Sequence, residues 1–400
     1  MELLHSLQKN LIKINEWLDN EKTKLEPNIY ISADIRSSGS KIAPVDINFF
    51  PACFNNLSQK SRIKTSQSFS EFFHNAKVQN ILIIPENYTR NIMYLKNVLA
   101  IQKIIKISGL SCAIGSTMIT EDITIPLGNG EQITIHAMEK TEYVLHNTAI
   151  HNPDALLLNT DLTSGTIDLP AKLKHKIFPE QVFGWHNRQK SKSFDIYNNV
   201  CMNFAKEFAL DPWFFSAIST SCHGISFKER ANIDLLAEKI NQTIEQISEA
   251  YKSHGVKSRP AVFVKANNGS HGMGIFIAKS GDDIMAMNKK NRDSMHKIKH
   301  QSIVDSVVIQ EAIPTNEFDN TAPKEHIALL VAGNLITFIA RSNKNKNAGD
   351  NLNQLGATFK DELEKLNDPM YKIIAKLVAI AAANERKIML ENSQSLDIRK

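Results

Sequence analysis

The chain has 400 residues, of which 42% are hydrophobic and 22% charged; this predicts a folded protein of two or three domains and excludes a disordered one. Its 47 Lys and Arg residues stand against 42 Asp and Glu residues, a net charge of +5, so any strong positive field must be local.

Cysteine usage and hydropathy indicate the compartment. The cysteines are widely spaced and form no C-x-x-C pair, which argues against a zinc site and a disulfide framework: Cys53, Cys112, Cys201 and Cys222. This usage suits a reducing cytosol. Residues 1–24 carry charges throughout and lack an apolar signal core, and the apolar run from Leu377 is far shorter than a membrane span. We expect a cytoplasmic protein without a membrane partner.

The first half of the chain alternates helical and strand patterns. Leucine and isoleucine recur at steps of three and four up to about residue 20, which predicts an amphipathic helix. Short apolar runs that end at polar or turn residues predict buried strands at residues 28–35, 80–86 and 154–161. A hairpin is expected around Gly128, Asn129 and Gly130. This alternation predicts an α/β fold.

The second half also mixes helices and strands. Residues 195–252 are mostly helical in pattern, with a break at Pro212, and residues 361–387 form a helical tail. Apolar runs predict strands at residues 258–266, 275–281 and 306–313 and a hairpin at residues 326–342.

The most informative segment is FVKANNGSHGMGIFIAK at residues 263–279, in which Lys265 precedes Gly269, Gly272 and Gly274. A dinucleotide fingerprint would read G-x-G-x-x-G and open a helix, and a Walker loop would end in Gly-Lys-Ser/Thr. This segment instead reads G-x-x-G-x-G between two strand patterns, which is typical of a glycine flap over phosphates. Its backbone amides could approach phosphate oxygens, and Lys265 would add a positive charge. A glycine-rich turn without a ligand is the alternative.

Two later segments extend this hypothesis. The strand that contains Gln310 and Glu311 stops at Pro314 among acidic residues, as an adenine-binding hinge would. The polar loop at residues 340–356 offers a cation and oxygen donors of the kind that Mg²⁺ prefers: Arg341, Asp350, Asn351 and Asn353. A solvated Asn-rich turn is the alternative for this loop.

Six segments, in order along most of the chain, resemble the ATP-grasp superfamily and more closely its proteobacterial glutamate-cysteine ligase family. They are SADIRSSGSKIAPVDINFFPACFNNL (32–57), LLNTDLTSG (157–165), FGWHNRQKS (183–191), VFVKANNGSHGMGI (262–275), VIQEAIPT (308–315) and DNLNQLGATF (350–359). The resemblance implies an N-terminal α/β domain that binds the amino acids, residues 1–195. It also implies an ATP-grasp domain of two subdomains that clasp ATP, residues 196–400.

The implied activity joins the γ-carboxylate of glutamate to the amine of cysteine through γ-glutamyl phosphate, with ATP and Mg²⁺, as the first step of glutathione synthesis. The implied catalytic cations are Lys265 and Arg341. The implied ATP contacts are Lys265, Gly269, Ser270, Gly272, Gly274, Gln310 and Glu311, and the implied metal ligands are Asp350, Asn351 and Asn353.

The amino-acid substrates require groups of both charges. Residues 34–56 offer cations, anions and neutral amides: Arg36, Lys41, Asp34, Asp46, Asn48, Asn55 and Asn56. Proline and glycine in this segment predict a shaped loop rather than a helix. Arg188 and Lys190 follow Trp185 on a turn and could hold a carboxylate or phosphate against an aromatic wall. A solvated surface is the alternative for both segments.

Other functions stay open at this stage. The enzyme could ligate glutamate to another amine, or the chain could be a nucleotide-binding relative without catalysis. Nucleic-acid binding through residues 288–300 is disfavoured, because this basic stretch contains Asp293 and no aromatic residue and suits a solvated helix face. The expected partners are the small molecules glutamate, cysteine and ATP, and homo-oligomer formation stays open.

Overall fold

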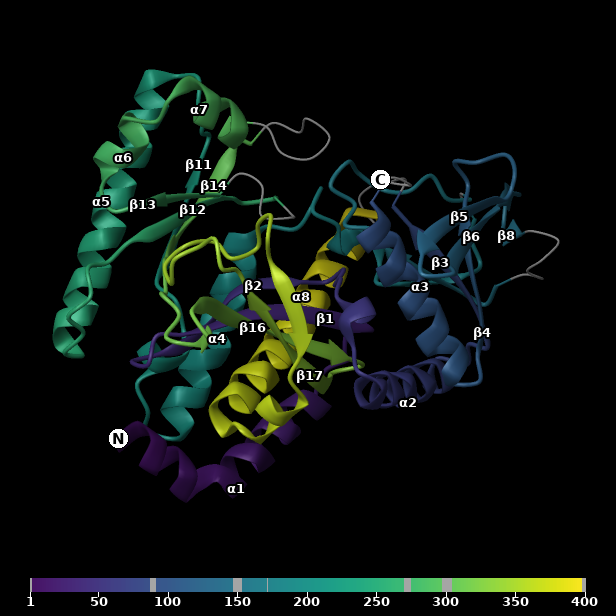
Figure 1. Cartoon of the computed structure of the whole chain (residues 1–400), viewed down its shortest axis with the longest axis horizontal. Coiled ribbons are helices and arrows are strands. Elements are labelled where there is room, and N and C mark those ends of the chain that lie inside the picture. Colours follow the sequence, from purple (N-terminus) through teal and green to yellow (C-terminus); the bar gives the residue numbers. More distant parts are fainter. Residues whose placement is uncertain are drawn as a thin grey trace.

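The chain folds into helices packed on three larger β-sheets (Figure 1). The computed structural model describes residues 2–86, 91–146, 153–170, 172–269, 275–296 and 304–397. Among these residues the helices are α1 (Glu2–Thr23), α2 (Gln59–Asn75), α3 (Ile92–Ile107), α4 (Lys190–Glu207), α5 (Arg230–Ser253), α6 (Gly281–Met285), α7 (Lys289–His296) and α8 (Pro369–Asp397). The short 3-10 turns are η1 (Phe54–Asn56), η2 (Gln181–Phe183), η3 (Pro212–Phe215) and η5 (Leu363–Asn367). The mixed α/β class is therefore confirmed. None of the described helices is both long and apolar enough to cross a membrane.

The central sheet is antiparallel and joins strands from both ends of the chain. Its order is β18-β17-β16-β1-β2, with β15 beside β16. The strands are β1 (Tyr30–Ser37), β2 (Ile42–Asn48), β15 (Phe318–Asp319), β16 (Ala322–Val331), β17 (Asn334–Ser342) and β18 (Thr358–Asp361). Since β1 pairs with β16, Asp34 lies opposite Ile327. The sheet thus draws strands from both sides of residue 195, and the domain boundary expected there stays a prediction.

The central sheet is buried on both faces, which explains why the sequence of β16 is almost wholly apolar after Glu325 and His326. Ala328 and Leu330 belong to the core cluster that includes α1, α4 and α8. The alternate residues Ile327, Leu329 and Val331 belong to the cluster that includes α2 and α3. Because successive side chains of a strand point to opposite faces, β16 contributes residues to both cores.

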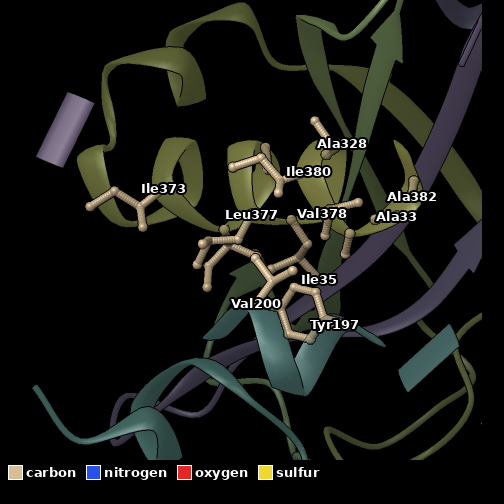
Figure 2. Packing of buried hydrophobic residues seen from close by; sticks show 14 of the residues in the cluster. Ala33, Ile35, Tyr197, Val200, Ala328, Ile373, Leu377, Val378, Ile380 and Ala382 are labelled. Carbon is tan, nitrogen blue, oxygen red and sulfur yellow. The ribbon is translucent and has the colours of Figure 1, made fainter. Parts of the chain in front are cut away.

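Helix α8 is the main cover on one of these faces. Figure 2 shows Leu377 and Val378 of α8 beside Val200 of α4 and Ile35 of β1. Leu377 and Val378 are fully buried. The α8 helix begins at Pro369 rather than near residue 361 as expected, because η5 occupies the chain before it.

The second sheet is mostly parallel, with the order β10-β9-β3-β4-β6-β5 and an antiparallel pairing only between β5 and β6. The strands are β3 (Asn80–Pro85), β4 (Ser111–Ser116), β5 (Ile123–Gly128), β6 (Glu131–Ala137), β9 (Ala155–Asn159) and β10 (Lys176–Phe178), and β7 (Glu139–Lys140) pairs separately with β8 (Leu145–His146). The strands predicted at residues 80–86 and 154–161 are confirmed. The hairpin at Gly128, Asn129 and Gly130 is confirmed too, since all three residues have positive φ.

The third sheet is antiparallel, has the order β11-β14-β12-β13, and packs against α5. Its strands are β11 (Ser219–His223), β12 (Val262–Ala266), β13 (Ile275–Ala278) and β14 (Ser306–Glu311). Lys265 of β12 pairs with Ile275 of β13, so the two strands predicted on either side of the glycine segment are confirmed, whereas residues 270–274 lie outside the described residues. The helical prediction for residues 195–252 is wrong at β11, where pairing with β14 sets the conformation.

The polar segment at residues 34–56 differs from the loop expected from its sequence, because residues 42–48 form the edge strand β2. Pro44 is tolerated there because an edge strand has backbone groups without a ladder partner. The register shifts beside it: Asp34 pairs with Asp46, whereas Ile35 pairs with Pro44. Val45 is therefore an extra residue, a β-bulge.

Candidate active site

A cavity lies where the β1–β2 hairpin, β16 and the flap strands β12 and β13 meet. Several predicted site residues line it together: Asp34, Arg36, Asp46, Lys190, Lys265, Gly269, Asn351 and Asn353. Its wall also contains residues that the sequence did not single out: Val45, Phe263, Ala266, Ile275 and Glu325. Ser270, Gly272 and Gly274 lie outside the described residues.

Lys265 is a buried cation held by neutral oxygens. Its Nζ donates to the Val45 carbonyl at 2.8 Å and to Gln310 Oε1 at 2.7 Å. Among the described residues, no carboxylate lies within ion-pair distance of it. Burial lowers the pKa of Lys265 to about 8, although Asp46 opposes this shift. The bulge at Val45 supplies the carbonyl, so an irregularity of β2 positions an unneutralised positive charge in the cavity wall.

A chain of four buried charges runs across three strands beside Lys265. Arg341 Nη1 on β17 lies 2.7 Å from Asp34 Oδ2 on β1 and 2.7 Å from Glu325 Oε1 on β16. Arg36 Nε on β1 lies 2.5 Å from Glu325 Oε2. Asp34 and Arg36 are two residues apart and so share a face of β1. The four side chains fix the register of β1, β16 and β17 around the cavity.

The charges of this chain shift one another's pKa values. Burial would raise the pKa of Glu325, but Arg36 and Arg341 hold it below its usual range. Burial raises the pKa of Asp34 despite Arg341, and the neighbouring carboxylate of Glu325 adds to the rise. Burial opposes protonation of Arg341, yet Asp34 and Glu325 raise its pKa above its already high value. Arg341 therefore stays charged, and its buried Nε has no partner among the described residues.

Asp46 and Lys190 form a second pair on the cavity wall, 2.5 Å apart. Burial would raise the pKa of Asp46, but Lys190 and Lys265 lower it to about 2. Lys190 Nζ also lies 4.4 Å from the ring centroid of Trp185, but Trp185 does not line the cavity, so the aromatic wall for a ligand stays a prediction. Asn48 donates weakly to Asp46 at 3.4 Å.

The start of α4 is tied to the end of β12 beside this pair. The backbone amide of Lys190 donates to the carbonyl of Asn267 at 2.7 Å, and that of Ser191 to Asn267 Oδ1 at 2.9 Å. The Asn267 amide nitrogen is buried and has no partner among the described residues. Asn267 thus couples the base of the flap to Lys190.

The predicted hinge residues lie behind the cavity rather than on its wall. Glu311 is fully buried and pairs with Lys41 Nζ at 2.8 Å, and Lys41 lies 4.4 Å from the ring centroid of Trp213. Gln310 accepts from Lys265. The Gln310 amide nitrogen and Glu311 Oε1 are buried without partners among the described atoms. Lys41 is therefore neutralised by Glu311, away from the other predicted substrate residues.

Arg188 is buried in the core and does not line the cavity. It is 1% exposed, and its guanidinium contacts Glu385 at 2.7 and 3.0 Å and the Ile47 carbonyl at 2.6 Å. All its nitrogens donate within the core, so it ties α8 to β2. Asn55 and Asn56 lie on η1, where the Asn55 amide donates to Asn56 Oδ1 at 3.4 Å, and they too are absent from the cavity wall.

Only part of the loop predicted to bind the metal ion lines the cavity. Asn351 and Asn353 line the cavity, and the Asn351 amide nitrogen is buried without a described partner. The Asp350 carboxylate accepts from the backbone and side chain of Asn347, while its carbonyl accepts from Arg36. Within the described ranges, no group of three or more His, Cys, Asp and Glu side chains could hold a metal ion.

Glu325 is the main residue that sequence reasoning missed. It sits in KEHIALL, just ahead of the apolar run of β16. The available signal was an acidic residue on a strand whose next residues are all buried, because such a charge must be paired.

Comparisons with known proteins identify the family of the chain. The sequence model of the glutamate-cysteine ligase family (GshA) matches residues 5–386. A crystal structure from Methylobacillus flagellatus KT, provisionally named a gamma-glutamylcysteine synthetase, has 29% identity and a TM-score of 0.87, over 98% of this chain and 96% of that chain. The search of curated proteins finds no match.

The family model and the shared fold thereby define an enzyme of the ligase class. The chain belongs to the glutamate-cysteine ligase family, which confirms the resemblance drawn from its sequence.

Replacing Glu325 by Ala should lower the free energy of unfolding by about 3–5 kcal/mol, because it leaves Arg36 and Arg341 buried without this carboxylate. Urea denaturation measures the effect. The matched control is Glu131→Ala, which removes an ion pair whose side chains are 45–47% exposed and should change stability little. Equal losses in the two variants would contradict the assigned role of the charge chain.

Proposed function

We propose that the enzyme joins the γ-carboxylate of glutamate to the amine of cysteine, with ATP as the phosphoryl donor and γ-glutamyl phosphate as the activated acid. Lys265 is the observation that carries this proposal. A buried cation without a carboxylate partner, at the base of a glycine flap, suits a phosphate group and would be a costly feature otherwise. This reaction is the first step of glutathione synthesis, and we place it in the cytoplasm.

Phosphoryl transfer mainly requires positioning and positive charge. Lys265 would contact the transferred phosphate from β12. Gly269, whose amide donates to the Ala266 carbonyl at 3.4 Å, would let a phosphate come close to the backbone because it has no Cβ. Arg341 does not line the cavity, so it would act through Asp34 and Glu325, which it holds in the cavity wall. The partnerless polar atoms of Gln310 and Glu311 fit a base-binding hinge behind the flap.

Mg²⁺ bound with the nucleotide would neutralise the charge of its phosphates. The residues present fit such an ion, because Asn351 and Asn353 line the cavity and carry amide oxygens. Asp350 does not line the cavity, but Asn347 donates only to its Oδ2, so Oδ1 is outside these two bonds. Glu325 is a poorer candidate, because Arg36 and Arg341 hold both of its oxygens. We therefore propose Asn351 and Asn353 as ligands, with Asp350 beside them.

The amino-acid substrates would bind to the remaining charged groups of the same wall. Arg36 and Lys190 offer cations for carboxylates, and Asp34 and Asp46 offer anions for an ammonium group. Each is paired inside the protein, so a bound amino acid would extend an existing ion pair with a group of opposite charge rather than displace a buried partner. In this proposal the third sheet and the central sheet act as the two subdomains of an ATP-grasp domain that clasp the nucleotide between them.

Phosphate release tests the proposal directly. With ATP and Mg²⁺, the purified protein should release phosphate at a substantial rate only when glutamate and cysteine are both present. A coupled phosphate assay with each substrate omitted in turn measures this. Release with another amine but not with cysteine would contradict the substrate assignment, and tight ATP binding without turnover for any amino-acid pair would identify a relative that has lost catalysis.

The charge on Lys265 predicts a pH dependence of ATP binding. Since its pKa is about 8, the ammonium is lost as the pH rises through that value, and ATP should bind about tenfold more weakly per pH unit above it. Calorimetric titration with Mg²⁺·ATP between pH 7 and 9.5 measures the effect. In Lys265→Met, binding should be weak and nearly independent of pH, and turnover should fall at least ~100-fold. A wild-type affinity that stays flat over this range would show that Lys265 does not meet the phosphates.

A further inference from the structure

Another cavity lies at the turn between β16 and β17, where α1, α2 and α8 come together. Its volume is about 540 Å³, within the range of small-molecule sites. Four lysines reach it from three helices, Lys22, Lys64, Lys372 and Lys376. Two carboxylates, Asp19 and Glu71, also line it. The lining therefore carries an excess of positive charge in a protein whose overall charge is nearly balanced.

Two of the four lysines of this cavity, Lys22 and Lys64, are bound to neutral oxygens. Lys22 Nζ donates to Asn334 Oδ1 at 2.8 Å. Lys64 Nζ donates to the carbonyls of Leu335 at 2.7 Å and Ile336 at 3.1 Å. Lys372 is exposed. Within the described part of the chain, none of these three lysines has a carboxylate within ion-pair distance.

The carboxylates do not cancel this charge. Asp19 is engaged by Lys376, 2.8 Å away. Glu71 is exposed and makes no ion pair with a described lysine, although it acts on Lys22 from a longer distance. Burial lowers the pKa of Lys22, opposed by Asp19 and Glu71 and reinforced by Lys376. Burial also lowers the pKa of Lys64, and Lys372 lowers it further. The lysines thus repel one another in a partly desolvated space, which an anion would relieve.

This cavity is separate from the candidate active site. The two share no lining residue. Leu330 lines the lysine cavity and Glu325 the active site, and these residues are five positions apart on β16, about 17 Å along a strand. The anion binders of the reaction, above all Lys265, therefore cannot account for the lysines here.

We propose that this cavity binds a small polyanion, a molecule with two or more phosphate or carboxylate groups, at a site distinct from the one where ATP and the amino acids react. Lysine ammonium groups are compact point charges that suit phosphate and carboxylate oxygens. Lys64 and Lys372 contact the ligand from α2 and α8, and Lys22 from the end of α1. The dimensions of the cavity restrict the ligand to the size of a metabolite.

Calorimetric titration with inorganic pyrophosphate and with citrate tests the proposal and separates the two kinds of anion. The titrations use the full-length Lys265→Ala protein as the parent, which weakens phosphate binding at the reaction cavity. Any binding that remains there at Arg36 and Lys190 is told apart because it does not respond to changes at Lys64 and Lys372. Lys372→Gln changes an exposed side chain and should weaken binding of at least one probe about tenfold, and adding Lys64→Gln should weaken it further. Lys239→Gln on α5 is the matched control, because Lys239 also donates to a neutral oxygen, that of Gln242.

The outcomes are distinct. Tighter binding of pyrophosphate assigns the site to phosphates, and tighter binding of citrate assigns it to polycarboxylates. Absence of binding in the Lys265→Ala parent, or an equal loss in Lys239→Gln, overturns the proposal. A change of oligomeric state in Lys64→Gln/Lys372→Gln, measured by size-exclusion chromatography without any loss of anion affinity, also overturns it and assigns the face to a second copy of the chain. None of these results depends on the ligase reaction.

Discussion

The buried chain of charges Asp34, Arg341, Glu325 and Arg36 is the constraint on which the rest of the site depends. A buried guanidinium without a carboxylate is very costly, so each of these residues requires the next one. Their positions come from β1, near one end of the chain, and from the consecutive strands β16 and β17, near the other end. Satisfying the charges therefore fixes the central sheet, and three of the four side chains, Asp34, Arg36 and Glu325, line the cavity.

Lys265 gains its significance from this arrangement. The cations around it are neutralised by carboxylates: Arg36 and Arg341 by Glu325, Lys190 by Asp46, and Lys41 by Glu311. Lys265 alone among these contacts only a carbonyl and an amide oxygen. The carbonyl belongs to the bulge at Val45, so the local irregularity of β2 and the third sheet meet at one ammonium group. A cation in that position is suited to an anion that arrives from outside, and the family of the chain makes a triphosphate the natural candidate.

Features encoded locally could be predicted from the sequence. The Gly128-Asn129-Gly130 hairpin follows from the positive φ angles that these residues adopt, and β3 and β9 follow from short apolar runs. The flap strands and Lys265 were found because glycines interrupt a strand pattern. The cavity then brings Lys265 together with Asp34, Asp46 and Lys190, which confirms that these distant segments meet.

Features that depend on partners far away in the sequence could not be predicted. The strand β2 contains Pro44, and only its place at a sheet edge makes this residue acceptable. Arg188 has the sequence context of a ligand-binding cation, yet Glu385 on the C-terminal helix takes it into the core. The sequence of β16 indicates that Glu325 needs a charged partner, but it does not indicate that Arg36 and Arg341 are those partners. Ion pairing is set by tertiary structure, and periodicity carries no information about it.

The central claim is that the flap, the hinge and the metal loop converge on one nucleotide at Lys265. A crystal structure with a non-hydrolysable ATP analogue, Mg²⁺ and glutamate tests it most directly. The account predicts the terminal phosphates within hydrogen-bonding distance of Lys265 Nζ, with Mg²⁺ near Asn351 or Asn353 and glutamate against Arg36 or Lys190. A nucleotide bound elsewhere, with Lys265 still held only by Val45 and Gln310, would contradict the account.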